Sequence, residues 1–319
     1  MKLNIGIIGY GNLGKSVEQF ILSNHNYNLV SIFSRRTVKS KYNTAIDNYD
    51  NITKYKDIID IMLLCGGSKN DLPEQTLETL KHFDCINAFD THSNIYSEKN
   101  KLNKIAIKTG HSLIMCCGWD PGIFSVLRGL IYAISHKKPI TFWGKGISMG
   151  HSDALRQVPG VKDAVQFTIP NQNAISLAKK NKVNSDMPLH FRDCYIVADK
   201  TKYNQIKKDV LSMKNYFQNQ PTSISFVSHE TLLNLKTKTG HKGQIISNFN
   251  TIQGTKNRFD LKVSMQSNSN LTAVIMCAYI KAIVHLKSAK SCGAFTCLDI
   301  PISYLYSREE QSKLIKELC

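Results

Sequence analysis

Two aspartates in this 319-residue chain follow short apolar runs, and their positions suit acid–base chemistry on a bound ligand. Asp90 follows the run 85–89, and Asp120 follows the run 112–116 through a short turn. If both runs are parallel strands, both carboxylates lie at the carboxyl edge of one sheet, where ligands bind in open α/β folds. A carboxylate there could orient a substrate ammonium or accept its proton, and the apolar Trp119 would exclude water. Either aspartate alone would also suit a turn or a helix cap.

A glycine-rich turn near the N-terminus has the spacing of a dinucleotide fingerprint. It follows the apolar run 3–8, opens a segment with helical periodicity, and consists of Gly9, Tyr10, Gly11, Asn12, Leu13 and Gly14. In this motif the first glycine permits the tight turn, the second lets a pyrophosphate approach the backbone, and the third allows close packing of strand and helix. The preceding strand and following helix favour a cofactor site over a turn kept only for packing.

The end of the second strand selects between the two nicotinamide cofactors. An NAD site would carry an acidic residue there for the ribose 2′-hydroxyl, but the run 29–33 leads into Ser34, Arg35 and Arg36. A hydroxyl and two guanidiniums suit the 2′-phosphate of NADP, because arginine matches phosphate geometry with a rigid fork of donors. NADP(H) is therefore the expected cofactor. The alternative is that both arginines are ordinary solvated loop charges.

The first part of the chain alternates apolar runs with helical or polar stretches. The runs lie at 5–8, 29–33, 58–65, 85–89 and 112–116. Such alternation is typical of βαβ units around a parallel sheet, which predicts a Rossmann-type dinucleotide-binding domain over 1–118. The third run ends in a turn that we expect to cover the cofactor, formed by Cys65, Gly66, Gly67 and Ser68.

The pattern changes after Gly118 to a mixture of short strands, loops and helices without a second glycine fingerprint. It predicts an inserted α+β domain over 119–269, so the expected fold class is α/β with two domains. A long apolar helix is expected over 271–288 and a last helix over 311–318. The C-terminal segment, from about residue 270 to 319, is expected to return to the first domain.

The formal net charge of +17 raises the question of a nucleic-acid partner. The lysines are spread in small groups, such as Lys179-Lys180 and Lys207-Lys208, and no basic stripe with interleaved aromatics is present. Nucleic-acid binding is therefore not expected. A basic surface would favour an anionic dinucleotide and a dicarboxylate substrate, although the charge also fits simple compositional bias.

Cysteine usage and the N-terminal region indicate the compartment. The nine cysteines are odd in number and include no CxxC spacing, so we expect reduced, mostly structural thiols. The first 25 residues lack the pattern of a signal peptide, and no run of about 18 apolar residues was found. These observations predict a cytoplasmic protein without a membrane segment. No metal site is expected, because His, Cys and carboxylate residues do not cluster at ligand spacing.

Several longer motifs make the chain similar to a known enzyme family. Beside the glycine turn, 34–36 and Asp90, the segments are 118–122 (Gly-Trp-Asp-Pro-Gly), 141–144, 150–154 (Gly-His-Ser-Asp-Ala), 166–168 and 293–296. Over essentially its whole length, the chain resembles the meso-diaminopimelate dehydrogenases. The resemblance implies NADP-dependent, reversible oxidative deamination of meso-2,6-diaminopimelate at its D-centre, giving L-2-amino-6-oxopimelate, ammonia and NADPH. It also implies a homodimer that serves lysine biosynthesis.

The resemblance further implies roles for individual residues. The group around the reacting amine would be Asp90, Trp119 and Asp120, together with Trp143 or its neighbour Phe142, Met149 and Gly150. The group that holds the L-configured end would be Thr168, Arg192, His241 and Asn268. The residue types agree with these roles, because Arg192 with Thr168 suits a carboxylate clamp. Taken alone, His241 would be a loop histidine.

The chain departs from the family pattern at three places, namely Asp90-Thr91-His92, Cys116-Cys117 and 266–269. The last of these leaves open whether Asn268 or Asn270 takes the substrate position. A same-fold NADP-dependent dehydrogenase acting on another D-amino acid or oxo acid is the alternative enzyme. A dinucleotide-binding sensor without turnover is the alternative from another class.

The segment His151-Ser152-Asp153 contains the residue types of a hydrolase triad. Three consecutive residues cannot form the nucleophile–base–orienter chain, which requires convergence in space. We expect instead a turn and a helix cap, with Ser152 or Asp153 leading into a helix at 154–156.

Overall fold

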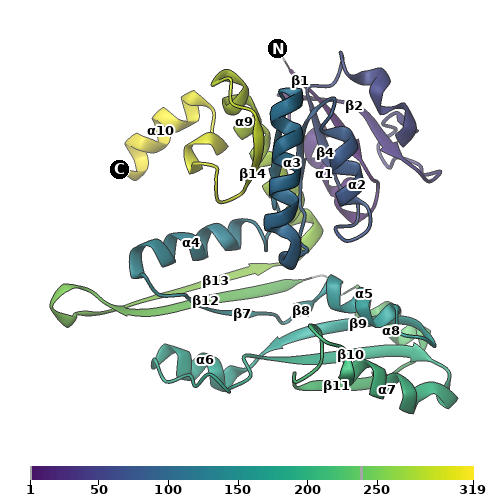
Figure 1. Cartoon of the computed structure of the whole chain (residues 1–319), viewed down its shortest axis with the longest axis vertical. Coiled ribbons are helices and arrows are strands. Elements are labelled where there is room, and N and C mark those ends of the chain that lie inside the picture. The colour runs from purple at the N-terminus through teal and green to yellow at the C-terminus, as the bar shows by residue number, and fades with distance from the viewer. Residues whose placement is uncertain (1, 238–239) are drawn as a thin grey trace. The chain divides into compact units, whose positions relative to one another are not determined.

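The computed structural model describes residues 2–237 and 240–319, and its chain forms two compact units (Figure 1). Unit 1 combines the chain up to Gly129 with Ser269–Cys319, and unit 2 is Leu130–Asn268. The sequence places the first boundary after residue 118, whereas the compact unit continues to Gly129. The difference falls in helix α4 (Ile123–Ser135), which begins in unit 1 and ends in unit 2.

Unit 1 is built on a seven-stranded sheet in which all neighbouring strands are parallel. In spatial order the strands are β14 (Gly293–Thr296), β6 (Ser112–Met115), β5 (Asp84–Asn87), β4 (Ile61–Leu64), β1 (Leu3–Ile8), β2 (Tyr27–Ser34) and β3 (Ile46–Asn48). Strands β4, β5 and β6 are buried along their whole length, as in parallel sheets covered on both faces. The Rossmann-type α/β fold predicted from the sequence is confirmed.

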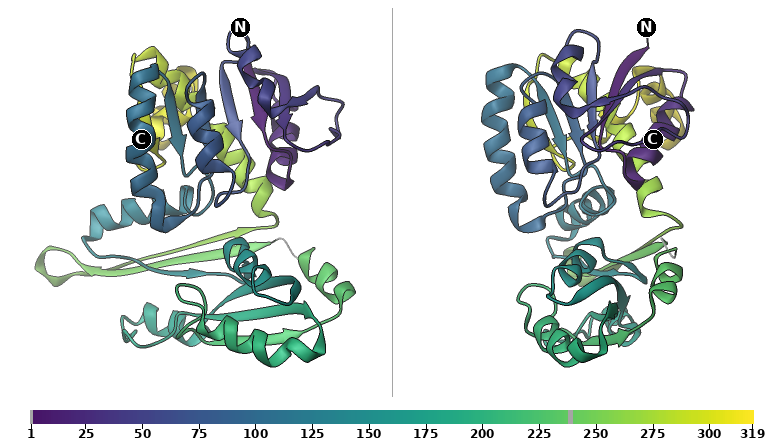
Figure 2. Two further views of the ribbon diagram at one scale, coloured as in Figure 1. Left: turned by 45° about the vertical axis from the view of Figure 1, so that its right-hand side comes forward. Right: turned by 90° about the vertical axis from the view of Figure 1, so that its right-hand side faces the viewer.

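Helices cover both faces of this sheet (Figure 2). One face carries α2 (Leu72–Thr79) and α3 (Ile95–Thr109), and the other carries α1 (Asn12–Leu22) and α9 (Asn268–Ser288). Val17 of α1 and Met276 of α9 belong to the same hydrophobic core as Ile7 of β1. The chain after Ser269 thus supplies a core helix as well as the edge strand β14.

Helix α9 has the length and composition that would allow it to cross a membrane. It escapes a search for unbroken apolar runs because Lys281 interrupts the pattern. Half of its most apolar window is buried inside the structure, and residues such as Ile280 and Ile283 are almost completely buried. This burial is typical of a core helix in a folded domain.

Unit 2 contains two smaller sheets (Figure 1). The four-stranded sheet has the order β11 (Thr222–Phe226), β10 (His190–Ala198), β9 (Val161–Pro170) and β8 (Gly146–Ile147). The three-stranded sheet has the order β13 (Lys256–Met265), β12 (His241–Asn250) and β7 (Ile140–Trp143). The helices of this unit are α5 (Met149–Arg156), α6 (Gln172–Lys179), α7 (Tyr203–Ser212) and α8 (His229–Lys236).

Short 3-10 helices and a last α-helix complete the fold. The 3-10 helices are η1 (Tyr49–Tyr55), η2 (His92–Asn94), η3 (Lys200–Lys202), η4 (Ile252–Gly254) and η5 (Ile302–Leu305). Helix α10 (Arg308–Leu318) begins with a capping box in which Ser307 and Glu310 exchange hydrogen bonds. It therefore starts three residues before the helix expected from the sequence at residue 311.

The expected helix cap at Ser152 or Asp153 is wrong. Helix α5 begins at Met149, so both residues lie inside it. Ser152 is buried, donates to the carbonyl oxygen of Ser148 at 2.6 Å and accepts the N–H of Gln166 at 2.9 Å. Its hydroxyl therefore joins α5 to β9 instead of capping a helix.

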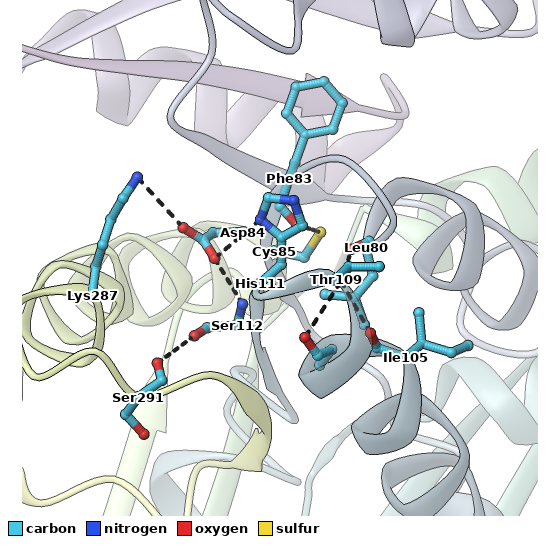
Figure 3. Close-up of polar contacts among 11 residues, drawn as sticks. Leu80, Phe83, Asp84, Cys85, Ile105, Thr109, His111, Ser112, Lys287 and Ser291 are labelled. Atoms are coloured by element: carbon cyan, nitrogen blue, oxygen red, sulfur yellow. Dashed lines mark hydrogen bonds and ion pairs between the residues drawn. The ribbon is translucent and has the colours of Figure 1, made fainter.

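A buried carboxylate joins three segments at the amino-terminal edge of the unit 1 sheet (Figure 3). Asp84 begins β5, and its Oδ1 accepts the N–H of Ser112 at 2.7 Å. His111 Nδ1 lies 3.7 Å from the same oxygen, and Lys287 Nζ lies 3.9 Å from Oδ2. Ser112 Oγ donates to the carbonyl oxygen of Ser291 at 3.1 Å. These contacts border a cavity of about 470 Å³ at the edge opposite the candidate site.

Candidate active site

The glycine turn between β1 and α1 has the geometry that a bound dinucleotide requires. Gly9 has a φ of +91°, a left-handed conformation that favours glycine. A Cβ on Gly14 would lie 2.1 Å from the carbonyl oxygen of Gly9, so only glycine lets the helix pack this closely on the turn. Apart from its neighbours along the chain, no described residue comes within 4 Å of the position that a Cβ on Gly11 would take, which leaves room for a pyrophosphate.

Helix α1 starts directly at this turn. Gly11 is its N-cap, and no side chain among the described residues caps the helix. Asn12 and Leu13 form the first turn, and Leu13 packs against the core of unit 1. The backbone N–H groups and the positive end of the helix dipole are therefore available to an anion.

Ser34, Arg35 and Arg36 follow at the carboxyl end of β2, beside the glycine turn in the sheet order. Ser34 Oγ accepts the N–H of Arg36 at 3.1 Å, which shapes the turn, and both arginine side chains are exposed. Arg35 forms an ion pair with Asp71, the residue before α2. Two exposed guanidiniums at this edge fit a 2′-phosphate.

The loop after β4 contains Cys65, Gly66, Gly67 and Ser68. Burial raises the pKa of the Cys65 thiol, so this cysteine is not a nucleophile at neutral pH. A Cβ on Gly66 would lie 2.3 Å from Oε1 of Gln75, so the loop packs closely on α2. Ser68 Oγ accepts the N–H of Asp90 at 2.8 Å. The expected cofactor loop is thus joined to a candidate catalytic residue.

A buried carboxylate behind the glycine turn was missed from the sequence. Glu18 of α1 is completely buried, and its two oxygens accept the hydroxyl groups of Tyr10 and Ser40, each at 2.5 Å. Tyr10 Oη in turn accepts the N–H of Lys41 at 3.0 Å. The available signal was an acidic residue on the buried face of a helix, since Glu18 shares that face with Val17 and Gly14.

The Gly-Trp-Asp-Pro-Gly segment is a closed turn between β6 and α4. Gly122 has a φ of +149°, and a Cβ there would lie 1.5 Å from the carbonyl oxygen of Gly118. The N–H of Gly118 donates to the carbonyl oxygen of Pro121 at 3.2 Å. Trp119 is buried and stacks on Phe124 with ring centroids 4.6 Å apart. The two glycines therefore allow the turn that presents Trp119 and Asp120.

Arg128 of α4 holds the carboxylate of Asp120 from both sides. Nη1 donates to Oδ2 at 3.0 Å and Nη2 donates to Oδ1 at 2.5 Å. Ser125 Oγ also donates to Oδ1, at 3.2 Å. Nothing in the sequence pattern marks Arg128 as this partner. The bidentate pair occupies lone pairs that a substrate proton would need.

Asp90 has a different environment from Asp120. It lies three residues after β5, and its side chain is exposed. No hydrogen-bond donor among the described residues contacts its carboxylate, while its backbone N–H is fixed by Ser68. Because β5 and β6 are parallel neighbours, Asp90 and the turn with Asp120 follow adjacent strands at the same edge of the sheet. The expected placement of both aspartates is found.

The clamp residues Arg192 and Thr168 lie together in unit 2. They face each other on β10 and β9, and Arg192 Nη1 donates to Thr168 Oγ1 at 3.1 Å. Arg192 is largely buried, which lowers the pKa of its guanidinium, and its Nε has no hydrogen-bond partner among the described residues. No described carboxylate lies within ion-pair distance of it. A largely buried cation with an unused donor suits a carboxylate ligand.

Two histidines beside Arg192 remain neutral near pH 7. Burial, and then the nearby Arg192 charge, lower the pKa of His151 and of His190 to about 4. His190 Nε2 accepts the N–H of Trp143 at 2.8 Å, which requires an unprotonated nitrogen. The positive charge of this region is therefore that of Arg192. The sequence did not predict a role for His190: it shares a strand face with Arg192, but its contact with Trp143 joins residues 47 positions apart.

The remaining substrate candidates are distributed over unit 2. His241 is buried, and its ring lies against Gly146, where a Cβ would come within 2.2 Å of the imidazole. The rings of Trp143 and His190 lie 5.2 Å apart. Met149 and Gly150 are exposed at the start of α5. Asn268 begins α9, whereas Asn270 Oδ1 accepts the hydroxyl of Ser16 at 2.8 Å in unit 1.

The candidate residues thus fall into two sets. The expected cofactor residues belong to unit 1, and the expected residues for the far end of the substrate belong to unit 2. The group expected around the reacting amine is divided, with Asp90, Trp119 and Asp120 in unit 1 and Trp143, Met149 and Gly150 in unit 2. The nine cysteines are free, and all except Cys292 and Cys319 are buried. Within residues 2–237 and 240–319, no group of three or more metal-ligating side chains gathers.

Sequence comparison relates the whole chain to known proteins. Residues 118–267 match the family described as Diaminopimelic acid dehydrogenase C-terminal domain. A meso-diaminopimelate D-dehydrogenase of Ureibacillus thermosphaericus is 38% identical, and the match covers 99% of each chain.

Two solved structures extend this similarity to the fold. The diaminopimelate dehydrogenase of Corynebacterium glutamicum in complex with DAP superposes with a TM-score of 0.93 at 32% identity, covering 100% of this chain and 99% of that one. An engineered D-amino acid dehydrogenase bound to NADP+ superposes with a TM-score of 0.90 at 31% identity, covering 100% of both chains.

Proposed function

Because this chain belongs to the meso-diaminopimelate D-dehydrogenase family, we propose that it catalyses the NADP-dependent, reversible oxidative deamination of meso-2,6-diaminopimelate. The reaction at the D-centre yields L-2-amino-6-oxopimelate, ammonia and NADPH, and it serves lysine and diaminopimelate biosynthesis. The observation that carries this proposal is the largely buried Arg192 side chain beside Thr168. Its Nε is buried without a hydrogen-bond partner among the described residues and suits the carboxylate at the far end of a dicarboxylic substrate.

NADP fits the residues that unit 1 provides. Gly9, Gly11 and Gly14 would hold the pyrophosphate at the start of α1, and Arg35 and Arg36 would bind the 2′-phosphate. When bound, the nicotinamide supplies the hydride acceptor. We therefore assign cofactor binding to unit 1.

Asp90 is the proposed proton acceptor. Hydride leaves the D-carbon only when its nitrogen can donate a lone pair, so the substrate ammonium must first lose a proton. The exposed carboxylate of Asp90 is available for that proton directly or through water, whereas Arg128 already holds both oxygens of Asp120. Asp120 would orient the ammonium as a fixed negative charge, and Trp119 would line the pocket.

Unit 2 would select the correct end of the substrate. The two ends of meso-diaminopimelate differ only in configuration, so discrimination requires contacts at the end that does not react. Arg192 and Thr168 would bind the L-carboxylate, with His241 and Asn268 beside it. Trp143, Met149 and Gly150 would line the pocket around the reacting centre. We assign substrate binding and homodimer formation to this unit. We further propose that the enzyme is cytoplasmic.

Activity measurements with meso-, LL- and DD-diaminopimelate and with simple D-amino acids test the proposal. Purified protein is mixed with NADP and meso-diaminopimelate, and reduced nicotinamide is followed by absorbance beside LL- and DD-diaminopimelate and simple D-amino acids. We expect strong reduction of NADP with the meso isomer and little with the LL isomer.

Arg192→Met should raise the KM for meso-diaminopimelate by about tenfold or more, since one charge-assisted bond contributes about 1.5–3 kcal/mol. Faster turnover of a simple D-amino acid would replace the proposed substrate and retain the fold and cofactor.

A further inference from the structure

The loops that follow β2 and β4 flank the glycine turn from opposite sides. Strand β1 lies between these two strands in the sheet. The N–H of Gly9 donates to the carbonyl oxygen of Phe33 at 2.9 Å, and the N–H of Cys65 donates to the carbonyl oxygen of Ile8 at 2.7 Å. A contact between the two loops therefore spans the carboxyl end of β1, where the glycine turn begins.

Arg35 and Asp71 make such a contact. Arg35 Nη2 donates to Asp71 Oδ1, and the second oxygen of Asp71 accepts the N–H of Gly67 at 2.9 Å. The backbone N–H of Asp71 donates to the carbonyl oxygen of Gly67, also at 2.9 Å. Asp71 is thus fixed to its own loop through two bonds and holds Arg35 from across the turn.

The two partners differ in how firmly they are held. The Arg35 side chain is 52% exposed and the Asp71 side chain is 31% exposed. A long, exposed arginine side chain loses conformational entropy when it binds a phosphate. A fixed carboxylate that already holds the arginine in place reduces the entropy lost on phosphate binding. The guanidinium has five N–H donors, so a bond from Nη2 to Asp71 leaves other donors for a phosphate.

We propose that Asp71 is a positioning residue that holds Arg35 for the 2′-phosphate and thereby increases the preference for NADP over NAD. The inference rests on the proposed cofactor. It assigns a role to the loop after β4 in cofactor choice, although Asp71 carries the same sign of charge as the phosphate. The opposite possibility, that Asp71 competes with the phosphate for Arg35, predicts the reverse effect.

Binding measurements separate these possibilities without turnover. Isothermal titration calorimetry with NADP, NAD and adenosine 2′,5′-bisphosphate is performed on the full chain and on Asp71→Asn, whose amide oxygen can still accept from Gly67. We expect about fivefold weaker binding of NADP and of the bisphosphate, equivalent to about 1 kcal/mol, and no change for NAD. In an Arg35→Ala background, Asp71→Asn should have no further effect. Glu78→Gln is the matched control, because Glu78 is an acidic residue of α2, the helix that Asp71 directly precedes, and it pairs with Lys81 instead.

Several outcomes of these measurements would overturn the inference. Tighter NADP binding in Asp71→Asn would identify a competitor, and unchanged NADP binding would show that Asp71 does not position Arg35. Equal weakening of NADP and NAD, or a further loss in the Arg35→Ala background, would identify a structural residue that does not act through Arg35. Failure of the unaltered protein to bind NADP would refute the proposed cofactor and the inference with it. If the unaltered protein binds NADP tightly and Asp71→Asn gives any of the contrary results above, only the inference is refuted.

Discussion

The two candidate catalytic aspartates lie in the loops that follow the neighbouring strands β5 and β6, and their carboxylates have different surroundings. Asp120 is held by both terminal nitrogens of Arg128, and Asp90 is exposed with only its backbone fixed by Ser68. A carboxylate in a bidentate ion pair is positioned and charged, which suits electrostatic binding of an ammonium. An exposed carboxylate with unused lone pairs suits proton transfer. The residue types alone gave both aspartates the same role.

Asp90→Asn should lower kcat by about 100-fold or more, because general-base catalysis typically contributes 10²–10⁴-fold. Asparagine keeps the shape and the backbone bond to Ser68, so we expect no change in the Kd for NADP or in Tm. Steady-state kinetics with saturating meso-diaminopimelate and calorimetric NADP binding measure the two effects. A kcat reduced less than threefold would show that Asp90 is not the proton acceptor.

Asp120→Asn is the comparison for this prediction. It removes the negative charge opposite Arg128, whose side chain is largely buried, so it should lower Tm as well as activity. If Asp120→Asn abolishes activity at unchanged Tm while Asp90→Asn remains active, the two roles are reversed.

Arg192 shows what residue types can and cannot predict. An arginine and a threonine in a dehydrogenase are reasonable carboxylate ligands, and the structure places them opposite each other on two strands. Their burial, and the neutral His151 and His190 beside them, result from a register that links residues far apart in sequence. The sequence could therefore suggest Arg192 and Thr168 as a candidate clamp, whereas their electrostatic surroundings depended on the tertiary structure.

At the level of elements, the sequence predicted best where a local pattern has one structural solution. The turn at Gly9 and the buried strands were found because glycine spacing and apolar runs are local signals. Helix α5 was misplaced because its N-cap Ser148 makes no side-chain capping bond, and Ser152 resembled a cap while lying inside the helix. The partner of Ser152 is the backbone of β9, which no local pattern indicates.

The glycine turn allows a test that separates folding from cofactor binding. Gly14→Ala should destabilise unit 1 by about 2 kcal/mol or more, because its Cβ would lie 2.1 Å from the Gly9 carbonyl oxygen. Gly11→Ala should leave Tm nearly unchanged, since no described residue other than its chain neighbours comes within 4 Å of that Cβ. It should weaken NADP binding by about tenfold or more, because the methyl group would meet the pyrophosphate. Thermal unfolding and calorimetry compare the two variants.

The opposite pattern for this pair of variants would contradict the assignment. Normal NADP affinity in Gly11→Ala would mean that the pyrophosphate does not approach the backbone at this position. A stable Gly14→Ala would mean that the helix can move away from the turn without loss.

Across the whole molecule, buried polar groups connect segments that are distant in sequence. Glu18 joins the glycine turn to the loop at Ser40, and Asp84 joins β5 to β6 and to Lys287 of α9. Such groups occupy positions where an amphipathic pattern predicts apolar residues. The sequence therefore shows that a polar residue is buried there, but it does not indicate which residue it contacts. The fold class was therefore predictable from the sequence, whereas these connections depended on tertiary contacts.

The stability of the protein should fall between pH 7 and pH 5. The pKa values of His151 and His190 are lowered from 6.5 to about 4 in the folded state, mainly by burial. As the pH decreases below 6.5, the unfolded chain binds protons that the folded chain does not, so the free energy of unfolding decreases until about pH 4. Each histidine should reduce it by about 2 kcal/mol at pH 5, as 1.36 kcal/mol corresponds to one unit of pKa difference. Urea denaturation at pH 7, 6 and 5 measures this change.

The variant His151→Gln tests whether these histidines cause the decrease in the free energy of unfolding. His151→Gln removes one of the two titrating side chains and should reduce the change between pH 7 and pH 5 by about half. The carboxylates do not obscure this window, because a lowered pKa such as that of Glu310, about 2, causes loss of stability only below the ordinary carboxyl range. A free energy of unfolding that stays constant or rises from pH 7 to pH 5 would show that both histidines are protonated in the folded protein, and the buried cation at Arg192 would then not be the dominant charge of this site.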